Sequence, residues 1–504
     1  MTLTALDWII VTLYLVGCLV AGLWMRKFVR GVQDFAVAGR EMDVNLGIAS
    51  LAATELGLVT IMYTAQLGYE KGFAGAAIGV IMASAIWLVG RTGFVIGPLR
   101  TAGVMTIPEL FEQRFSPRVR WLAGLFVVLG GLLNMGIFLR LGGEFLVHAT
   151  GLPPGWLEWI MTALLGLVLL YTALGGMLSV LVTDYLQFLV MGVGIVATSV
   201  LVLMHIVWDN LVDTLYQRWA ADAAAGGVQK IAHPFNPAHA TSFGWAYLLW
   251  QFFFQLAGTT TWQTQISRVL AAKDAATARK MYRHTSFYFV GRFLLPGLWG
   301  AAACVWFAQH GGLPAELTTL TAMPHYLSLV LPAGIIGIVV AAMLAAEMST
   351  DSGYMLTWAT VIYNDLVTPC LRRPLSPRGQ LVLTRLLVLG IAIFLLFYGL
   401  WYELPGNAWD YLAVTGNIYL ASVFTLLVAG LYWPRANATG AAAALVLGAL
   451  GPIVFLLLGR KFAIPPEIAG ASSFALAALG MIAGSLLTPP PSLATPANPI
   501  ATAP

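Results

Sequence analysis

The sequence predicts an all-α membrane protein that crosses the bilayer many times, and three observations lead to this fold class. The chain has 504 residues, of which 59% are hydrophobic and only 10% are charged, a balance that is typical of polytopic membrane proteins. Most of its apolar segments are long enough to cross a hydrocarbon core of about 30 Å as a helix. Lys and Arg gather in alternate loops between these segments, as expected for a chain that passes back and forth through a membrane.

The apolar runs predict about thirteen transmembrane helices. Their expected bounds are residues 5–25, 46–68, 74–98, 121–147, 156–176, 178–206, 243–264, 285–307, 330–362, 380–401, 407–432, 438–458 and 467–487. An odd number of crossings places the two termini on opposite sides of the membrane.

The distribution of basic residues gives the orientation. Four of the predicted loops carry most of them: Arg26, Lys27, Arg30 and Arg40; Arg100, Arg114, Arg118 and Arg120; Arg268, Lys273, Arg279, Lys280 and Arg283; and Arg372, Arg373 and Arg378. Positive loops favour the cytoplasm. We therefore expect a multi-pass protein of the cell inner membrane, the plasma membrane, with an outer N-terminus and a cytoplasmic C-terminus.

Two segments outside the predicted helices differ in character. Residues 207–242 form a long outer loop with a short helical pattern. Residues 488–504 are rich in Pro and uncharged, which predicts a disordered cytoplasmic tail.

The most informative segment is residues 339–365, VVAAMLAAEMSTDSGYMLTWATVIYND. It is apolar and of membrane length, yet five polar residues lie in its middle: Glu347, Ser349, Thr350, Asp351 and Ser352. Polar groups cost free energy in hydrocarbon, so they indicate a functional site. On a helix, Ala346, Ser349, Thr350 and Gly353 share one face. That face could present oxygen atoms to a hard cation. Alternatively, it could be a seam of small residues whose hydroxyls bond their own backbone.

Two further carboxylates lie in predicted spans. Glu55 is accompanied by Thr54, Gly57, Thr60 and Thr64, a combination that favours a discontinuous helix whose freed carbonyls coordinate a ligand. The alternative is a Glu that pairs with an Arg on another span. Asp184 lies near the cytoplasmic end of its helix, at the expected depth of Ser352, so these two residues could meet. Alternatively, Asp184 is an interfacial carboxylate at the start of a helix.

Five segments together resemble the sodium:solute symporter family, which includes proline and sugar symporters. They are DFAVAGREM (34–42), TIPELFEQRFSPRVR (106–120), YTALGGMLSVLVTDYLQ (171–187), QISRVLAAKDAATARK (265–280) and AAEMSTDS (345–352). The resemblance implies a leucine-transporter-like fold. Five spans in residues 46–206 and five in residues 243–432 would be inverted repeats, with one extra span in residues 1–45 and two in residues 433–487.

The resemblance also implies a Na⁺ site. Its ligands would be the carbonyls of Ala53, Leu56 and Ala346 with the hydroxyls of Ser349 and Thr350, and such neutral oxygens suit a weakly held monovalent ion. Some family members hold a second Na⁺ at positions that match Asp184, Ser349 and Ser352. A fourth position of that pattern, often Ser, is Gly353 in this chain. We therefore expect one Na⁺ and leave the second open.

The solute site is expected at the membrane midplane. The candidates are Thr60, Gln255 and Thr259, with Glu55 in substrate binding or coupling. Arg140 either pairs with Glu144 one turn away on its helix or binds a carboxylate solute. Gln66 and Tyr69 are candidates for an outer gate. Membrane-depth acids need partners, so Glu347 and Asp351 are expected to form ion pairs with Arg91, Arg140 or Arg292.

These features predict a secondary active transporter that symports Na⁺ and a small organic solute by alternating access. A proton-coupled carrier and a transporter-like membrane sensor are the alternatives. An enzyme is not expected, because the sequence contains neither HExxH nor GxSxG. Expected partners are the solute and the lipid bilayer but no nucleic acid. The solute and the oligomeric state do not follow from the sequence.

Overall fold

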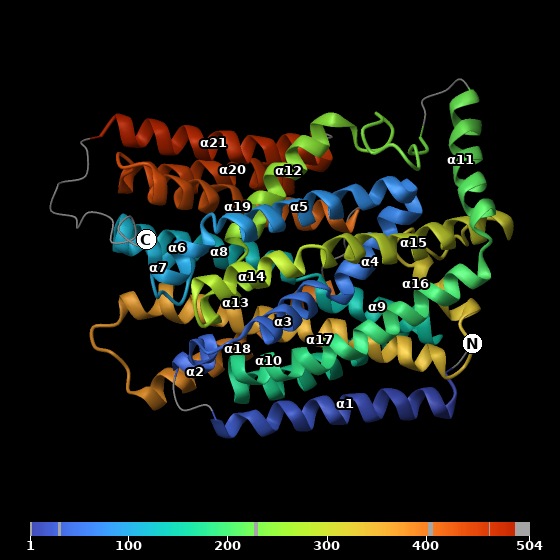
Figure 1. Cartoon of the computed structure of the whole chain (residues 1–504), viewed down its shortest axis with the longest axis horizontal. Helices are drawn as coiled ribbons and strands as arrows, with labels where there is room; N and C mark the ends of the chain where they lie inside the picture. Colours follow the sequence, from blue (N-terminus) through green and yellow to red (C-terminus); the bar gives the residue numbers. More distant parts are fainter. Residues whose placement is uncertain (1–2, 29–31, 226–229, 402–406, 463, 489–504) are drawn as a thin grey trace.

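The computed structural model describes residues 3–28, 32–225, 230–401, 407–462 and 464–488, and this part of the chain folds into packed helices without a named strand (Figure 1). The helices are α1 (Ala5–Met25), α2 (Val32–Val37), α3 (Val44–Glu55), α4 (Leu58–Lys71), α5 (Ala77–Thr92), α6 (Ile96–Thr101), α7 (Ile107–Arg114), α8 (Pro117–Met135), α9 (Phe138–Thr150), α10 (Leu157–His205), α11 (Trp208–Ala224), α12 (Gly244–Thr261), α13 (Gln263–Ala271), α14 (Ala275–Thr285), α15 (Tyr288–Gln309), α16 (Ala322–Val330), α17 (Ile335–Val361), α18 (Pro377–Trp401), α19 (Ala408–Tyr432), α20 (Ala438–Phe462) and α21 (Pro466–Leu486).

Ten helical stretches in the described residues are long and apolar enough to cross a membrane. Two of them each contain two predicted spans. The stretch Leu58–Thr92 holds α4 and α5, and α10 has a non-helical residue at Gly176 (φ 54°, ψ −147°). With the shorter pair α12 and α13, these helices account for the thirteen predicted segments.

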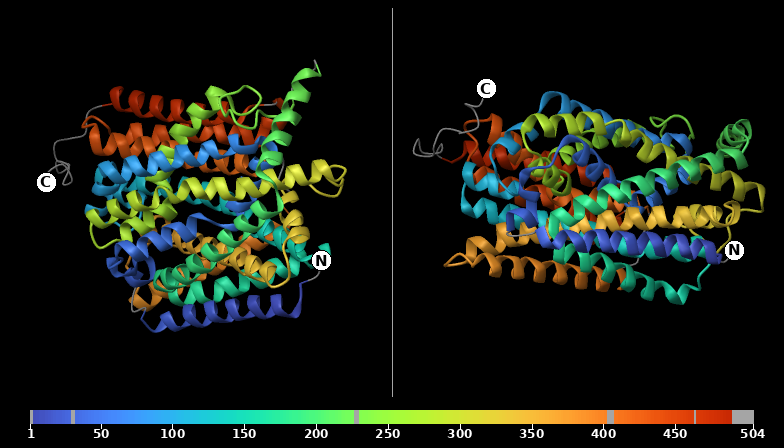
Figure 2. Two further views of the ribbon diagram at one scale, coloured as in Figure 1. Left: turned by 45° about the vertical axis from the view of Figure 1, so that its right-hand side comes forward. Right: turned by 60° about the horizontal axis from the view of Figure 1, so that its bottom comes forward.

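The two ends of the helix bundle carry the loops that the charge pattern assigned to opposite sides. The short helices α2, α6 and α7 lie at one end, where α21 also ends (Figure 1). The helices α11 and α16 and the start of α1 lie at the other end, and the views in Figure 2 agree. The predicted disordered tail, apart from residue 488, falls outside the described residues.

The predicted interruption of the second span is present between α3 and α4. Leu56 leaves the helical region (φ −99°, ψ 60°) and Gly57 is extended (φ −65°, ψ 160°). The break packs against the middle of α17, which is buried along almost its whole length. A Cβ atom on Gly57 would lie 2.4 Å from the Thr350 hydroxyl oxygen, so only glycine allows this close approach.

The helices α4 and α15 also touch through glycine. A Cβ on Gly68 would lie 2.0 Å from the carbonyl oxygen of Gly297, and one on Gly300 would lie 1.8 Å from that of Ala65. Membrane helices pack closely where small residues let their backbones approach. The glycines therefore fix α4 against α15 at backbone contact.

We predict that Gly300→Ala lowers the melting temperature strongly, because the new methyl group would overlap a backbone carbonyl that cannot move alone. Overpacking of this kind typically costs about 1–3 kcal/mol, and occasionally more. Gly291→Ala on the same helix is the matched control, since nothing lies within 4 Å of its Cβ position. Thermal unfolding of the two purified variants would test this, and equal melting temperatures would contradict it.

Candidate functional site

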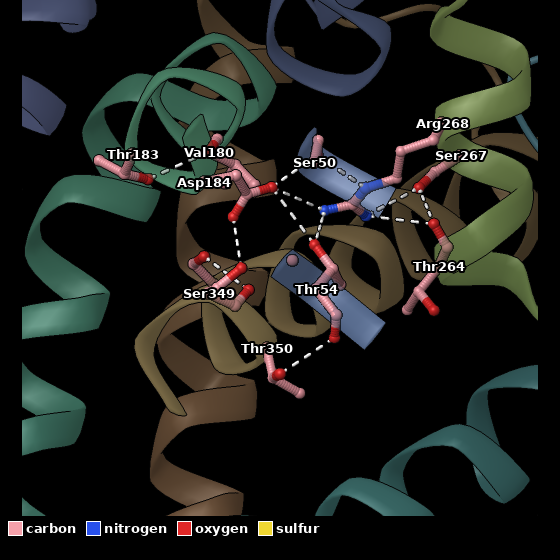
Figure 3. A network of polar contacts seen from close by, with 12 residues as sticks. Ser50, Thr54, Val180, Thr183, Asp184, Thr264, Ser267, Arg268, Ser349 and Thr350 are labelled. Carbon is pink, nitrogen blue, oxygen red and sulfur yellow. Dashed lines mark hydrogen bonds and ion pairs between the residues drawn. The ribbon is translucent and has the colours of Figure 1, made fainter. Parts of the chain in front are cut away.

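The centre of the molecule is the contact between the α3–α4 break and α17. The Thr350 hydroxyl donates a hydrogen bond to the carbonyl of Thr54 (3.0 Å), and the Ser349 hydroxyl donates to Oδ1 of Asp184 (2.6 Å; Figure 3). Both side chains are buried. Because each hydroxyl proton is already used, the oxygen lone pairs remain available to accept from a donor or to coordinate a cation.

Backbone carbonyls complete this region. The helix α3 ends at Glu55, so the carbonyls of its last turn lose their regular helical partners. Among the described residues, no hydrogen bond reaches the carbonyl oxygens of Ala53 or Leu56. Ala346 is fully buried one turn before Thr350 on α17. Thr350 thus meets the break, and Ala346 and Ser349 lie within one turn of it on the same helix. Neutral oxygens such as theirs suit a hard monovalent ion.

Asp184 lies beside this region and is already well supplied with donors. Its Oδ2 accepts hydrogen bonds from Ser50 (2.6 Å) and Thr54 (3.3 Å), and the Arg268 guanidinium lies 3.4 Å away (Figure 3). Ser352, predicted to share a second ion with Asp184, instead donates to the backbone carbonyl of Ser349 (3.1 Å). Asp184 is therefore hydrogen-bonded to Ser349, while the Ser352 hydroxyl bonds its own helix.

The position of Arg268 corrects the sequence analysis, which placed it in a cytoplasmic loop. Arg268 lies within α13, where its side chain is 1% exposed. Its guanidinium also donates to the Thr54 hydroxyl (2.7 Å) and to the carbonyl of Thr264 (3.1 Å). The charge of Asp184 is therefore neutralised inside the protein by a residue 84 positions away in the sequence.

A cavity of about 80 Å³ lies next to the break. Glu55, Thr60 and Gln255 line it, as predicted. Thr259 is not among the lining residues, although the neighbouring Gly258 is. Arg140 also lies away from this cavity and pairs with Glu144 (3.0 Å), so the structure gives it the helix salt bridge rather than a place in the pocket.

Arg292 is a charged cavity residue that the sequence analysis did not assign to the site. It extends from α15 to within 3.5 Å of the Glu55 carboxylate, and it donates to the hydroxyls of Thr60 (3.0 Å) and Tyr63 (3.1 Å). The only sequence signal was a single Arg in an apolar run, FVGRFLLPG. The alternative reading of Glu55, a carboxylate paired with an Arg on another span, is therefore correct alongside the predicted helix break.

The expected partners of Glu347 and Asp351 are wrong. Arg292 pairs with Glu55, Arg140 pairs with Glu144, and the side chain of Arg91 is exposed. Within the described part of the chain, the carboxylate oxygens of Glu347 and Asp351 are buried without a hydrogen-bond partner. Glu347 lies against Gly142, where a Cβ atom would come within 2.7 Å of its Oε1. Neither acid therefore has the buried basic partner that was expected for it.

Near the end of α4, Gln66 belongs to a polar network around Glu70. The Glu70 carboxylate accepts from Gln66 (3.1 Å), Thr319 (2.6 Å) and Asn407 (3.1 Å). The network joins α4 to the segment before α16 and to the start of α19. Tyr69, the other residue predicted at a gate, lines a separate pocket with Arg218 and Thr319.

Comparison with known proteins is consistent with this arrangement. The sodium:solute symporter family model matches residues 35–448. The sodium/glucose cotransporter of Vibrio parahaemolyticus is 27% identical over 487 residues, which cover 90% of this chain and 85% of that protein. The high-affinity proline transporter of Bacillus subtilis is 26% identical over 485 residues, covering 94% and 97% respectively.

Solved structures show the same fold. A Na⁺-coupled sialic acid symporter in a substrate-bound, outward-open state superposes with a TM-score of 0.81 at 20% identity, covering 97% of this chain and 98% of the other. The nucleobase-cation-symport-1 family transporter Mhp1 gives a TM-score of 0.54 at 13% identity, covering 92% and 97%. The predicted leucine-transporter-like fold is thereby confirmed. The family model spans most of the chain, and this multi-pass membrane protein belongs to the sodium:solute symporter family.

Proposed function

We propose that the protein symports Na⁺ with one small organic solute, and that the ion binds between the α3–α4 break and α17. The observation that carries this proposal is the contact of Thr350 with the break. Thr350 donates a hydrogen bond to the carbonyl of Thr54 (3.0 Å) and packs against Gly57, where there is no room for a Cβ atom. The proposed ligands are the carbonyls of Ala53, Leu56 and Ala346 and the hydroxyls of Ser349 and Thr350. The matched relatives include a sodium/glucose cotransporter and a high-affinity proline transporter.

The proposed coupling follows from the position of the solute cavity. Thr54, Glu55 and Thr350 line the cavity, and they lie at or beside the proposed ion ligands. An ion that orders the break therefore also orders one wall of the solute site. Two ligands coupled in this way stabilise each other's binding by the same free energy.

We further propose a stoichiometry of one Na⁺. Asp184, the only charged member of the second candidate site, is neutralised by Arg268 and bonded to Ser50, Thr54 and Ser349. A second cation at Asp184 would meet the guanidinium at close range, where like charges repel strongly in a low-dielectric interior.

The proposed location is the plasma membrane, with the N-terminus outside, because the ends of the bundle separate the Lys- and Arg-rich loops from the others.

Thermal unfolding of the purified protein with Na⁺ or K⁺, with and without a solute panel, tests the proposal. A ligand that binds only the native state adds RT ln(1 + [L]/Kd), or about 2.7 kcal/mol at 100 times its Kd. We expect Na⁺ to raise the melting temperature and a solute to add to it only in Na⁺. A solute shift that is equal in K⁺ would contradict Na⁺ coupling and favour the proton-coupled alternative.

A further inference from the structure

The solute cavity contains one buried negative and one buried positive charge that hold each other loosely. Glu55 and Arg292 are 4% and 9% exposed, and their only mutual contact is 3.5 Å long. A direct charge-assisted hydrogen bond is usually about 2.7–2.9 Å. Burying two charges is favourable only when good geometry and further hydrogen bonds satisfy them, so each group retains capacity for another partner.

Three buried polar atoms of the cavity wall have no hydrogen-bond partner among the described residues: Nε1 of Trp409, and a donor and an acceptor that belong to this pair or lie beside it. Nε of Arg292 is a buried donor, and Oε1 of Gln265 is a buried acceptor; neither has a hydrogen bond among the described residues. Both residues line the cavity. Buried polar atoms are nearly always bonded in native proteins, so unpaired ones at a cavity wall indicate where a ligand bonds.

The neutral polar groups of the wall are largely engaged with the protein itself. The Asn134 amide nitrogen donates to Leu412 and Thr415, the Gln255 amide donates to Gln251, and the Thr350 hydroxyl donates to Thr54. The rest of the lining is mainly apolar and aromatic, and includes Phe138, Phe254, Trp262, Tyr354 and Trp409. Such a wall offers few free neutral groups to a polyol, but it suits a compact apolar body.

We propose that the solute is a small zwitterion, an amino carboxylate, whose carboxylate binds Arg292 and whose ammonium group binds Glu55 and Gln265. This inference rests on the proposed function, because it names the solute of the same symport. Glu55 and Arg292 sum to no net charge, so a zwitterion leaves the cavity neutral, whereas a net anion or cation would add an unpaired buried charge. When no solute is bound, Glu55 and Arg292 pair with each other instead.

The inference can be tested on the full-length protein in Na⁺ by thermal shift and titration calorimetry. The probes are the common L-amino acids, the amide and the desamino acid of the best binder, and glucose. The amide lacks the negative charge and the desamino acid lacks the positive one. We expect the zwitterion to bind about ten- to a hundredfold more tightly than either analogue, because each loses a charged hydrogen bond.

Two variants assign each end of the solute. Glu55→Gln should weaken zwitterion binding by about ten- to a hundredfold while changing binding of the desamino acid little, since that analogue has no group for Glu55. Arg292→Gln should likewise weaken zwitterion binding while changing binding of the amide little, since the amide has no negative charge for Arg292. Glu144→Gln is the matched control, because it alters an ion-paired carboxylate outside the cavity. A preserved Na⁺-induced shift shows that each variant is folded.

The outcomes separate this inference from the proposed function. Na⁺-dependent binding of glucose, or a Na⁺ shift without binding of any amino acid, would overturn the zwitterion and leave Na⁺ symport standing. Equal binding of the zwitterion and the desamino acid would also overturn it. Absence of any Na⁺ effect would instead reject the proposed function.

Discussion

Replacing both Ser349 and Thr350 by alanine should raise the Na⁺ concentration required for half-maximal solute uptake by about thirty- to a hundred-and-fiftyfold. Each hydroxyl is a proposed ion ligand, and the loss of a bonded polar group in a buried site typically costs about 1–1.5 kcal/mol. The two losses add because the residues contribute separate oxygen atoms. Uptake into proteoliposomes, measured over a range of Na⁺ at constant ionic strength, gives this value directly.

Two variants control this experiment. Thr360→Ala removes a buried hydroxyl from the same helix, but that hydroxyl bonds only the carbonyl of Leu356 (2.8 Å), so the Na⁺ requirement should not change. Thr350→Ser retains the hydroxyl and should behave nearly as the native protein does. An unchanged Na⁺ requirement in the double alanine variant would remove the proposed ion site.

Arg268→Gln should produce the largest loss of stability, because it leaves Asp184 without its buried counter-charge. Breaking a buried ion pair at one partner typically costs about 3–5 kcal/mol. The double variant Arg268→Gln with Asp184→Asn should recover part of this loss, since no charge then remains unpaired. Melting temperatures of the single and double variants form a double-mutant cycle that measures the coupling of the pair.

The same variant tests the stoichiometry. With Arg268 replaced, the Asp184 carboxylate and its hydroxyl partners Ser50 and Ser349 can accept a cation, so Na⁺ should stabilise Arg268→Gln more than the native protein. Arg279→Gln, which removes an exposed charge on α14, is the control. If the native protein already shows cooperative binding of two Na⁺ ions, the proposed exclusion of a second ion by Arg268 is wrong.

The features predicted correctly from the sequence depend on local pattern. The break between α3 and α4 followed from polar residues beside Gly57 in an apolar run, because glycine weakens a helix and the polar groups indicate a use for the freed backbone. The polar face of α17 followed from helical spacing. The membrane-spanning helices followed from hydropathy, since each span must satisfy its own backbone hydrogen bonds.

The features that were missed depend on contacts between distant segments. Glu55 meets Arg292 across 237 positions, and Asp184 meets Arg268 across 84. Arg268 was misplaced because the surrounding QISRVLAAKD contains enough polar residues to resemble a loop. Its burial is possible only because Asp184 and four neighbouring oxygen atoms receive its donors. Hydropathy along one segment holds no information about such a partner, so the expected pairs for Glu347 and Asp351 were equally unsupported.

The glycine contacts between α4 and α15 have a mechanical consequence. Because backbone meets backbone at Gly68 and Gly300, these two helices have no side-chain layer in which to slide, and they can only tilt together. The other half of the same membrane crossing, α3, lies beyond the break and bonds to α10 and α13 through Ser50 and Thr54. Leu56 and Gly57 therefore form a hinge between α3 and α4, which are anchored to different neighbouring helices. Any tilt of α4 relative to α3 changes the spacing of the carbonyls proposed to hold the ion, so occupancy and tilt are linked by geometry.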